Sequence, residues 1–277
     1  MANPKVRKDL LVKVERAYEH IIYLNAEILR FTVQGHPYET FHEDDLNRGE
    51  RTYYLRVLKE IPPQFSALIG DIAQNLRSSL DHLAWHLVKS SPVTPKARDS
   101  DIYFPIFETA REYRTKKMRK IRGMTDAAIK AIDSIEPYYR PDGPGPGIGQ
   151  GARLFWLHEI NRLDKHRLLV PTWTIMVSHT IMRTKRVEMA DVIRAALGNN
   201  PGPVFVAANA VTSGPLKDGS KLLTLPISEV EENMTFNVRI SLGEPKWVCG
   251  KDVSTTLAAM HKSVEKIMIS FDDEGLL

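Results

Sequence analysis

The fold of this 277-residue chain is decided by a long helical pattern whose centre reads Asp71-Ile72-Ala73-Gln74-Asn75-Leu76-Arg77-Ser78-Ser79-Leu80-Asp81-His82-Leu83-Ala84-Trp85-His86. Apolar side chains recur there every three or four residues, which predicts an amphipathic helix from about Gln64 to Lys89. The same spacing predicts further helices at residues 10–35, 125–135, 153–169 and 253–271. The helix at 153–169 is apolar almost all round, which is typical of a buried helix.

The period of the apolar residues changes from about 3.6 to two after Pro171. Apolar and polar residues alternate from Met234 to Ile240, as in a half-buried strand. We also expect strands at residues 204–206, 222–225 and 246–249, and a short helix from Arg51 to Lys59. Because few helix-length segments separate the strands, the sheet should be antiparallel.

The sequence therefore predicts an α+β fold. A helical bundle of four or more long helices carries a small antiparallel sheet, inserted before the C-terminal helix. The expected domains are a bundle at residues 1–170, a β insertion at 171–250, and a helix at 251–277 that packs back on the bundle.

The composition is that of a globular protein, with 43% hydrophobic and 26% charged residues, and it excludes a disordered chain. No apolar run reaches the roughly 18–20 residues of a membrane helix, so we expect no membrane partner. The N-terminus lacks the apolar core of a secretory signal. The single cysteine, Cys249, cannot form an internal disulfide, which favours a cytoplasmic protein.

Candidate functional residues lie on the polar side of the helix at 64–89. A stripe of short polar side chains runs along one face, formed by Asp71, Asn75, Ser78, His82 and His86. Lys and Glu are more usual on a solvated face, so this composition favours a site between helices. Arg77 and Asp81 lie at the flank of the stripe, one turn apart.

Arg77 and His82 form an Arg-x4-His pattern on this helix, which resembles the signature of the HEPN superfamily. Active members of that superfamily are helical-bundle ribonucleases. The resemblance implies a metal-independent endoribonuclease acting as a toxin or phage-defence effector, with a composite site in a homodimer. The sheet after Pro171 lies outside the resemblance.

The chemistry expected of such a site is simple. His82 has an ordinary pKa of about 6.5, so it would serve as general base or acid toward RNA. Arg77 would bind the phosphate through its guanidinium fork. Asn75, Ser78 and Asp81 would orient His82.

A basic segment from Arg111 to Arg122 is the expected binding surface for RNA, with an aromatic ring that would stack a base. The residues expected there are Arg111, Tyr113, Arg114, Lys116, Lys117, Arg119, Lys120 and Arg122. The alternative interpretation of such a run is a solvated face.

A second polar cluster interrupts the apolar helix at 153–169. We expect Asn161, Asp164 and His166 to support the site, and Asn161 and Asp164 to contact the helix that carries Asn75 and Arg77. The motifs Leu76–Trp85 and Asn161–Arg167 together resemble a pair found in uncharacterised bacterial and phage proteins, which implies nothing about chemistry. Both clusters also fit a buried structural network.

Two other functions remain open from the sequence. His82 and His86 are four residues apart and could share a metal ion, completed by His158, Glu159, Asp164 or His166, in a metal-dependent hydrolase. A non-catalytic interaction protein is the other alternative. We expect no cofactor and no bound metal.

Overall fold

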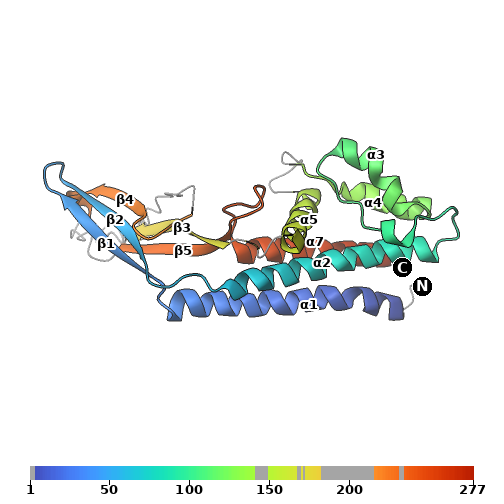
Figure 1. Ribbon diagram of the computed structural model, residues 1–277, viewed down its shortest axis with the longest axis horizontal. Coiled ribbons are helices and arrows are strands. Elements are labelled where there is room, and N and C mark those ends of the chain that lie inside the picture. The colour runs from blue at the N-terminus through green and yellow to red at the C-terminus, as the bar shows by residue number, and fades with distance from the viewer. Residues whose placement is uncertain (1–3, 141–148, 167–169, 171, 182–214, 231–233) are drawn as a thin grey trace, which may run out of the picture. The chain divides into compact units, whose positions relative to one another are not determined.

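The computed structural model describes residues 4–140, 149–166, 170, 172–181, 215–230 and 234–277. It divides into two compact units (Figure 1). Unit 1 combines residues 1–28, 62–172 and 242–277, and unit 2 combines residues 29–61 and 173–241. The helical and strand content confirms an α+β fold.

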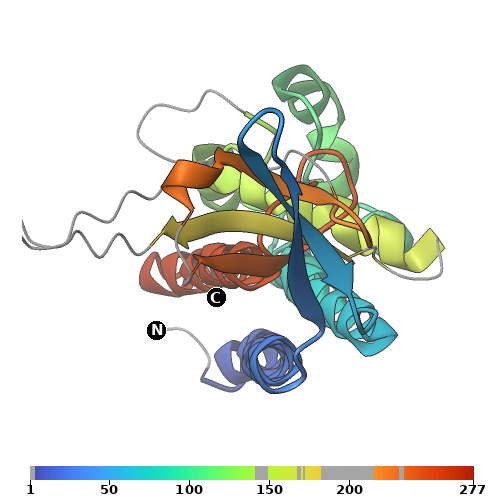
Figure 2. The ribbon, with the colours of Figure 1, turned by 90° about the vertical axis from the view of Figure 1, so that its left-hand side faces the viewer.

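Unit 1 is helical, and four of its helices are long, as the sequence predicts. Its elements are α1 (Pro4–Leu29), α2 (Pro63–Ser90), η2 (Asp99–Asp101), α3 (Ala110–Ile121), α4 (Asp126–Ile135), α5 (Gln150–His166) and α7 (Val253–Asp273). Figures 1 and 2 show α1, α2 and α7 side by side, and α5 packs across α2 and α7. No helix among the described residues is both long and apolar enough to span a membrane.

Local sequence accounts for where these helices begin. Pro63 stands in the first turn of α2, where its missing N–H costs nothing. The side chain of Thr125 accepts a hydrogen bond from the backbone N–H of Ala128 at the start of α4, and Asp252 does the same for Thr255 at the start of α7.

The core of unit 1 lies where α2, α5 and α7 pack against one another. The apolar side of α2 is almost fully buried, through Ile69, Ile72, Ala73, Leu76, Leu80 and Leu83. Gly70 allows the closest approach of α5, since a Cβ atom there would lie 2.1 Å from Oδ1 of Asp164. Glycine at this position thus sets the spacing of the two helices.

Unit 2 contains a π-helical turn and two sheets. Its elements are η1 (Arg30–Gln34), β1 (Tyr38–Asp45), β2 (Glu50–Val57), β3 (Thr172–Ile181), β4 (Lys221–Pro226), η3 (Ile227–Glu229) and β5 (Met234–Leu242). β1, β2 and β4 form an antiparallel sheet in that order, and β3 pairs with β5. Tyr53, Leu55 and Leu222 form its small buried cluster.

Three sequence expectations are wrong. The segment Arg51–Lys59 lies largely in strand β2, because Tyr53, Leu55 and Val57 alternate with polar residues and Gly49 turns the hairpin at a φ of +66°. Residues 29–61 therefore join the β insertion rather than the bundle at 1–170. Residues 246–249 form a turn, in which Pro245 O accepts from the N–H groups of Val248 and Cys249.

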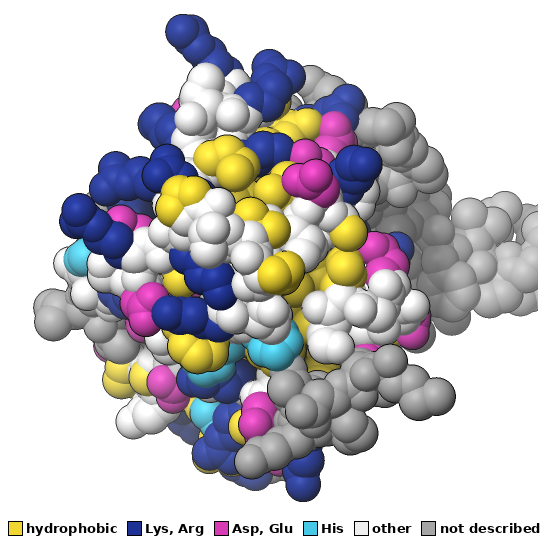
Figure 3. Space-filling model, turned by 90° about the vertical axis from the view of Figure 1, so that its right-hand side faces the viewer, with side chains coloured by type: hydrophobic (Ala, Val, Ile, Leu, Met, Phe, Trp, Pro, Cys, Tyr) yellow, Lys and Arg dark blue, Asp and Glu magenta, His cyan; other side chains and the backbone are white. Residues whose placement is uncertain are grey.

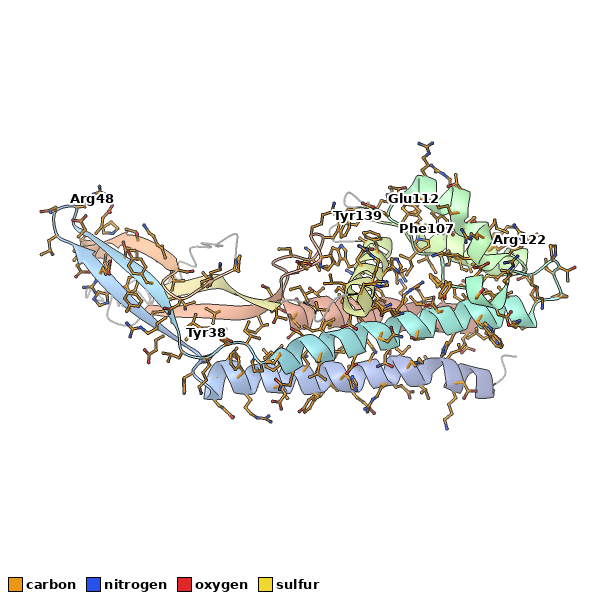
Figure 4. All side chains as sticks on the ribbon, in the orientation of Figure 1. Tyr38, Arg48, Phe107, Glu112, Arg122 and Tyr139 are labelled. Atoms are coloured by element: carbon orange, nitrogen blue, oxygen red, sulfur yellow. The ribbon has the colours of Figure 1, made fainter. Side chains whose placement is uncertain are left out.

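Two of the other expected elements are confirmed, and one lies outside the described residues. Strand β4 confirms the prediction at 222–225, and α7 confirms the helix after residue 253. The expected strand at 204–206 lies outside the described residues. Figure 4 shows Tyr38 and Arg48 toward opposite ends of the β1–β2 hairpin.

Candidate functional site

Arg77 and Asp81 form a buried ion pair that ties α2 to the segment after it. Nη2 of Arg77 lies 2.9 Å from Oδ1 of Asp81 and donates to the carbonyl oxygen of Phe104 at 2.9 Å. The same Oδ1 of Asp81 accepts from the backbone N–H of Phe104 at 2.9 Å. The pair thus satisfies both backbone polar groups of Phe104, whose side chain is fully buried.

Burial shapes the electrostatics of this pair. The Arg77 side chain is 5% exposed and that of Asp81 is 21% exposed. Burial raises the pKa of Asp81, and the nearby charges of Arg77 and Lys120 oppose that shift. Burial lowers the pKa of Arg77 against the opposing charge of Asp81. Arg77 is thus held as a structural cation, with little of its surface left for a ligand.

His82 and His86 line an open pocket of about 650 Å³ that Asp81 also lines. The pocket is lined by Asp9, Leu10, Asp81, His82, Trp85, His86, Asp99, Ile102 and Tyr103. All of these residues belong to unit 1. Arg77 is not among the lining residues, so the structure does not bring Arg77 and His82 together in one cleft.

Both histidines of the pocket are biased toward the neutral imidazole. Burial lowers the pKa of His82, the charge of Lys13 lowers it further, and Asp81 opposes the shift. Burial also lowers the pKa of His86. A neutral imidazole at neutral pH is a proton acceptor, as a general base must be.

Two further basic side chains, Lys120 and His158, lie close enough to the buried guanidinium of Arg77 for its charge to act on them. Burial, and then the charge of Arg77, lower the pKa of Lys120 to about 8. The same two causes lower the pKa of His158 to about 3. Nη1 of Arg77 and Nδ1 of His158 are both buried without a hydrogen-bond partner among the described residues. Asp81 is the carboxylate that offsets this charge.

The expected supporting residues lie at several places. Asn75 donates to the carbonyl of Asp71, and Ser78 accepts from Gln74, so these bonds run along α2 and do not reach His82. Asp81 borders the pocket and is the one expected orienting residue found beside His82.

The polar residues of α5 divide between two places. Asn161 is buried, with its Oδ1 unpartnered among the described residues, and Asp164 lies against Gly70 of α2. The predicted contact of Asp164 with α2 is confirmed. His166 instead lines a second pocket, with Glu159, Arg162 and Cys249.

The basic segment forms helix α3 and the turn after it, and its residues have unequal surroundings. Tyr113 is 4% exposed and donates to Asp133, so it cannot stack a base as expected. Lys117 pairs with Asp133, Lys116 pairs with Glu112, and Lys120 lies over the ring of Phe107. The exposed side chains without an ion pair among the described residues are Arg111, Arg114, Arg119 and Arg122.

The end of unit 1 that carries α3 and α4 exposes many Lys and Arg side chains, among acidic and apolar ones. Figure 4 labels Phe107, Glu112 and Arg122 there, and Figure 3 shows Lys and Arg side chains spread over this face. We call the exposed set of Arg111, Arg114 and Arg119 in α3, together with Arg122 directly after it, the α3 arginines.

Metal ligands do not gather in the described part of the chain. No group of three His, Cys, Asp or Glu side chains there is placed to hold a metal ion. His82 and His86 therefore lack a third ligand among the described residues, and His158, Glu159, Asp164 and His166 do not line their pocket.

Several residues of the pocket were not expected from the sequence. Trp85 lies in the same helix as the two histidines, and a tryptophan on the polar side of an amphipathic helix is a usable signal. Asp9 and Tyr103 line the pocket and come from α1 and from the segment after α2. Lys13 of α1 does not line it, but its charge acts on His82. No local pattern marks them, because only tertiary packing brings them to His82.

Comparison with known proteins gives no further guide to the site. No family model, no curated protein and no solved structure matches the chain.

Proposed function

We propose that the chain is a metal-independent endoribonuclease that cleaves RNA in the pocket of His82 and His86. The observation that carries this proposal is that two imidazoles, one turn apart on α2, line one open pocket beside exposed aromatic rings. Two imidazoles are enough for cleavage at a ribose, since one accepts a proton while the other donates one.

The reaction is an internal transfer at phosphorus. His82, as the neutral base, accepts the proton of the ribose 2′-hydroxyl, and the 2′-oxygen then attacks the adjacent phosphorus. The bond from phosphorus to the 5′-oxygen breaks, and His86 in its protonated form donates a proton to that oxygen. The products are a 2′,3′-cyclic phosphate and a free 5′-hydroxyl.

Lys13 is the cation proposed to stabilise the negative charge on the phosphate. Its charge acts on His82, and it lies one helical turn from Asp9, which lines the pocket. This is the role that the sequence assigned to Arg77. Arg77 is instead proposed as a positioning residue, because it holds Asp81, which lines the pocket, and the backbone of Phe104, which follows Tyr103 of the pocket.

The α3 arginines are proposed to bind the RNA backbone. The α3 arginines are exposed. Lys120, in the same helix, is close enough to Asp81 of the pocket for the charges of Lys120 and Asp81 to interact. An RNA strand along α3 would therefore pass near the wall of the pocket. Such contacts are sequence-independent and weaken with salt.

The test is cleavage of end-labelled single-stranded RNA in excess chelator. Wild type should cleave and leave 2′,3′-cyclic phosphate ends, and a single 2′-deoxy substitution at the cleaved nucleotide should block that cut. His82→Ala and His86→Ala should each reduce the rate by about 10²–10⁴-fold. His42→Ala, which removes an exposed histidine of unit 2, is the matched control and should cleave like wild type.

Two results would overturn the proposal. One is equal cleavage by wild type and His82→Ala, which would indicate a contaminant. The other is the absence of cleavage with every RNA tested, when each protein has the melting temperature and circular dichroism of a folded chain.

A second candidate is a non-catalytic interaction protein. The observation in its favour is a set of exposed apolar side chains on α1, where Tyr18, Ile22 and Tyr23 are each 52–56% exposed. Under this alternative, alanine at Ile22 and Tyr23 would abolish capture of a partner, whereas His82→Ala would leave it unchanged. An RNA-cleavage result for His82 decides between the two functions.

A further inference from the structure

The pocket of His82 has the size and the aromatic surface of a site for a flat ligand. Its volume of about 650 Å³ lies within the usual range for small-molecule sites. Trp85 is 48% exposed and Tyr103 is 46% exposed, although both line the pocket. Exposed aromatic side chains of this kind stack nucleobases in proteins that bind single-stranded nucleic acids. Because Nζ of Lys89 lies over one face of the Trp85 ring, 5.7 Å from its centre, a base would stack on the other face.

The charge of the lining separates the base from the phosphate. Three of the lining residues are aspartates, namely Asp9, Asp81 and Asp99, so a phosphate placed among these carboxylates would meet like charge. A carboxylate instead favours a ligand edge that carries N–H donors. The nucleobase should therefore lie beside the aspartates, and the phosphate should lie at His82 and His86, on the side of Lys13.

The three carboxylates are not equally free to accept hydrogen bonds. Asp81 is paired with Arg77, and Asp99 is paired with Lys89. In the part of the chain that the structure describes, no ion pair involves Asp9. Asp9 is therefore the carboxylate placed to accept from a ligand.

We propose that this pocket selects guanine, with the base stacked on Trp85 or Tyr103 and its Watson–Crick edge bonded to Asp9. Guanine carries two adjacent donors, N1–H and the 2-amino group, that match the two oxygens of a carboxylate. Adenine and cytosine place a ring acceptor beside their amino donor, and uracil places its N–H between two carbonyls. These three bases would each set an acceptor against the carboxylate.

The inference that this pocket selects the base of an RNA substrate rests on the proposed function. Its test does not, because binding of a nucleoside is measured without cleavage. The probes are guanosine, inosine, adenosine, cytidine and uridine, none of which carries a phosphate. Binding is followed by calorimetry and by the quenching of tryptophan fluorescence.

Wild type should bind guanosine about tenfold or more tightly than adenosine, cytidine or uridine. Inosine, which lacks only the 2-amino group, should also lose about tenfold. Asp9→Asn should abolish the preference for guanosine over inosine, and Glu15→Gln, an exposed carboxylate elsewhere on α1, should preserve it. Trp85→Ala should weaken the binding of every nucleoside and remove much of the quenching.

The outcomes separate this inference from the proposed function. Guanosine binding that depends on Asp9, with no cleavage of any RNA, would support the inference and overturn the ribonuclease. Cleavage that depends on His82 but shows no preference for guanine would overturn the inference alone. Equal affinity of wild type for guanosine and adenosine, or no binding of either, would also overturn it.

Discussion

The guanidinium of Arg77 and the carboxylate of Asp81 lie 2.9 Å apart on successive turns of α2, and together they hold both polar groups of the Phe104 backbone. Arg77 is the more deeply buried partner, while Asp81 borders the pocket. The two members of the pair should therefore respond differently to removal.

Asp81→Ala should cost about 3–5 kcal/mol of unfolding free energy, because it leaves a buried cation without its counter-charge. Arg77→Met should cost less, since the carboxylate that remains can be hydrated from the pocket. Chemical denaturation of the two single variants and of the double variant measures this. A double variant as unstable as the sum of the two would show that the ion pair contributes no coupling.

Gly151→Ala should destabilise unit 1 by about 1–3 kcal/mol. A Cβ atom at residue 151 would lie 2.1 Å from the carbonyl oxygen of Glu136 and 2.6 Å from that of Tyr138, and neither backbone atom can move easily. Gly149→Ala is the matched control, because nothing lies within 4 Å of a Cβ atom there. Similar melting temperatures for the two variants would contradict the packing at the start of α5.

Acid should destabilise the protein partly through His158. Its pKa is lowered to about 3 by burial and by the charge of Arg77, against about 6.5 in an unfolded chain. Between these values the unfolded chain binds a proton that the folded chain does not, so stability falls as the pH falls from about 6.5 toward 3.

Between pH 7 and pH 4, the loss of unfolding free energy should be smaller by roughly 1–3 kcal/mol in His158→Gln than in wild type. The measurement is the unfolding free energy from pH 7 to pH 4, with His166→Gln, an exposed histidine on the same helix, as the control. An unchanged slope in His158→Gln would show that His158 does not titrate in this way.

The rate of RNA cleavage should peak below about pH 6.5, the ordinary pKa of an imidazole. His82 must be neutral and His86 protonated, and the pKa of each is lowered by burial. The rate therefore falls on the acid side as His82 gains its proton, and on the alkaline side as His86 loses its own.

Lys13→Met provides a sharper test of the same profile. Lys13 lowers the pKa of His82, so its removal should shift the acid limb of the profile to higher pH. Lys262→Met, an exposed lysine on α7, should leave both limbs in place. An acid limb that does not move in Lys13→Met would assign it to a group other than His82.

Replacing two of the α3 arginines by Gln should weaken RNA binding without changing the rate at saturating RNA. Each lost phosphate contact should also flatten the dependence of log K on log salt by about 0.7 for a single strand. Filter binding over a range of salt concentrations measures both effects, with Lys262→Gln and Lys266→Gln on α7 as controls. If the controls weaken binding equally, the RNA does not follow α3.

The sequence predicts the long helices well because each is a local pattern. The apolar residues of α2 repeat at helical spacing from Phe65 to Val88, and Thr125 and Asp252 lie at the helix ends, where their side chains form caps. Strand β2 is harder to find, because only Tyr53, Leu55 and Val57 alternate and a short segment of this kind also fits one helical turn.

Only some of the residues that line the pocket can be predicted from local sequence patterns. His82, Trp85 and His86 are neighbours on one helix, so their meeting follows from the sequence. Asp9 and Tyr103 meet them only through the packing of α1 and of the segment after α2. The burial of Arg77 has the same origin, since it depends on the Phe104 backbone 27 residues away.

The position of strand β2 between β1 and β4 also determines the order in which the strands of this sheet can pair during synthesis. Strand β2 is flanked on one side by β1, which is near in sequence, and on the other by β4, whose Thr224 bonds to Thr52 across 172 residues. During synthesis the β1–β2 hairpin can form early, but the edge of β2 that pairs with β4 stays unpaired until residues 221–226 have left the ribosome. N-terminal fragments that stop before Lys221 should therefore expose that edge and aggregate, and the last sheet contacts should be among the slowest to form.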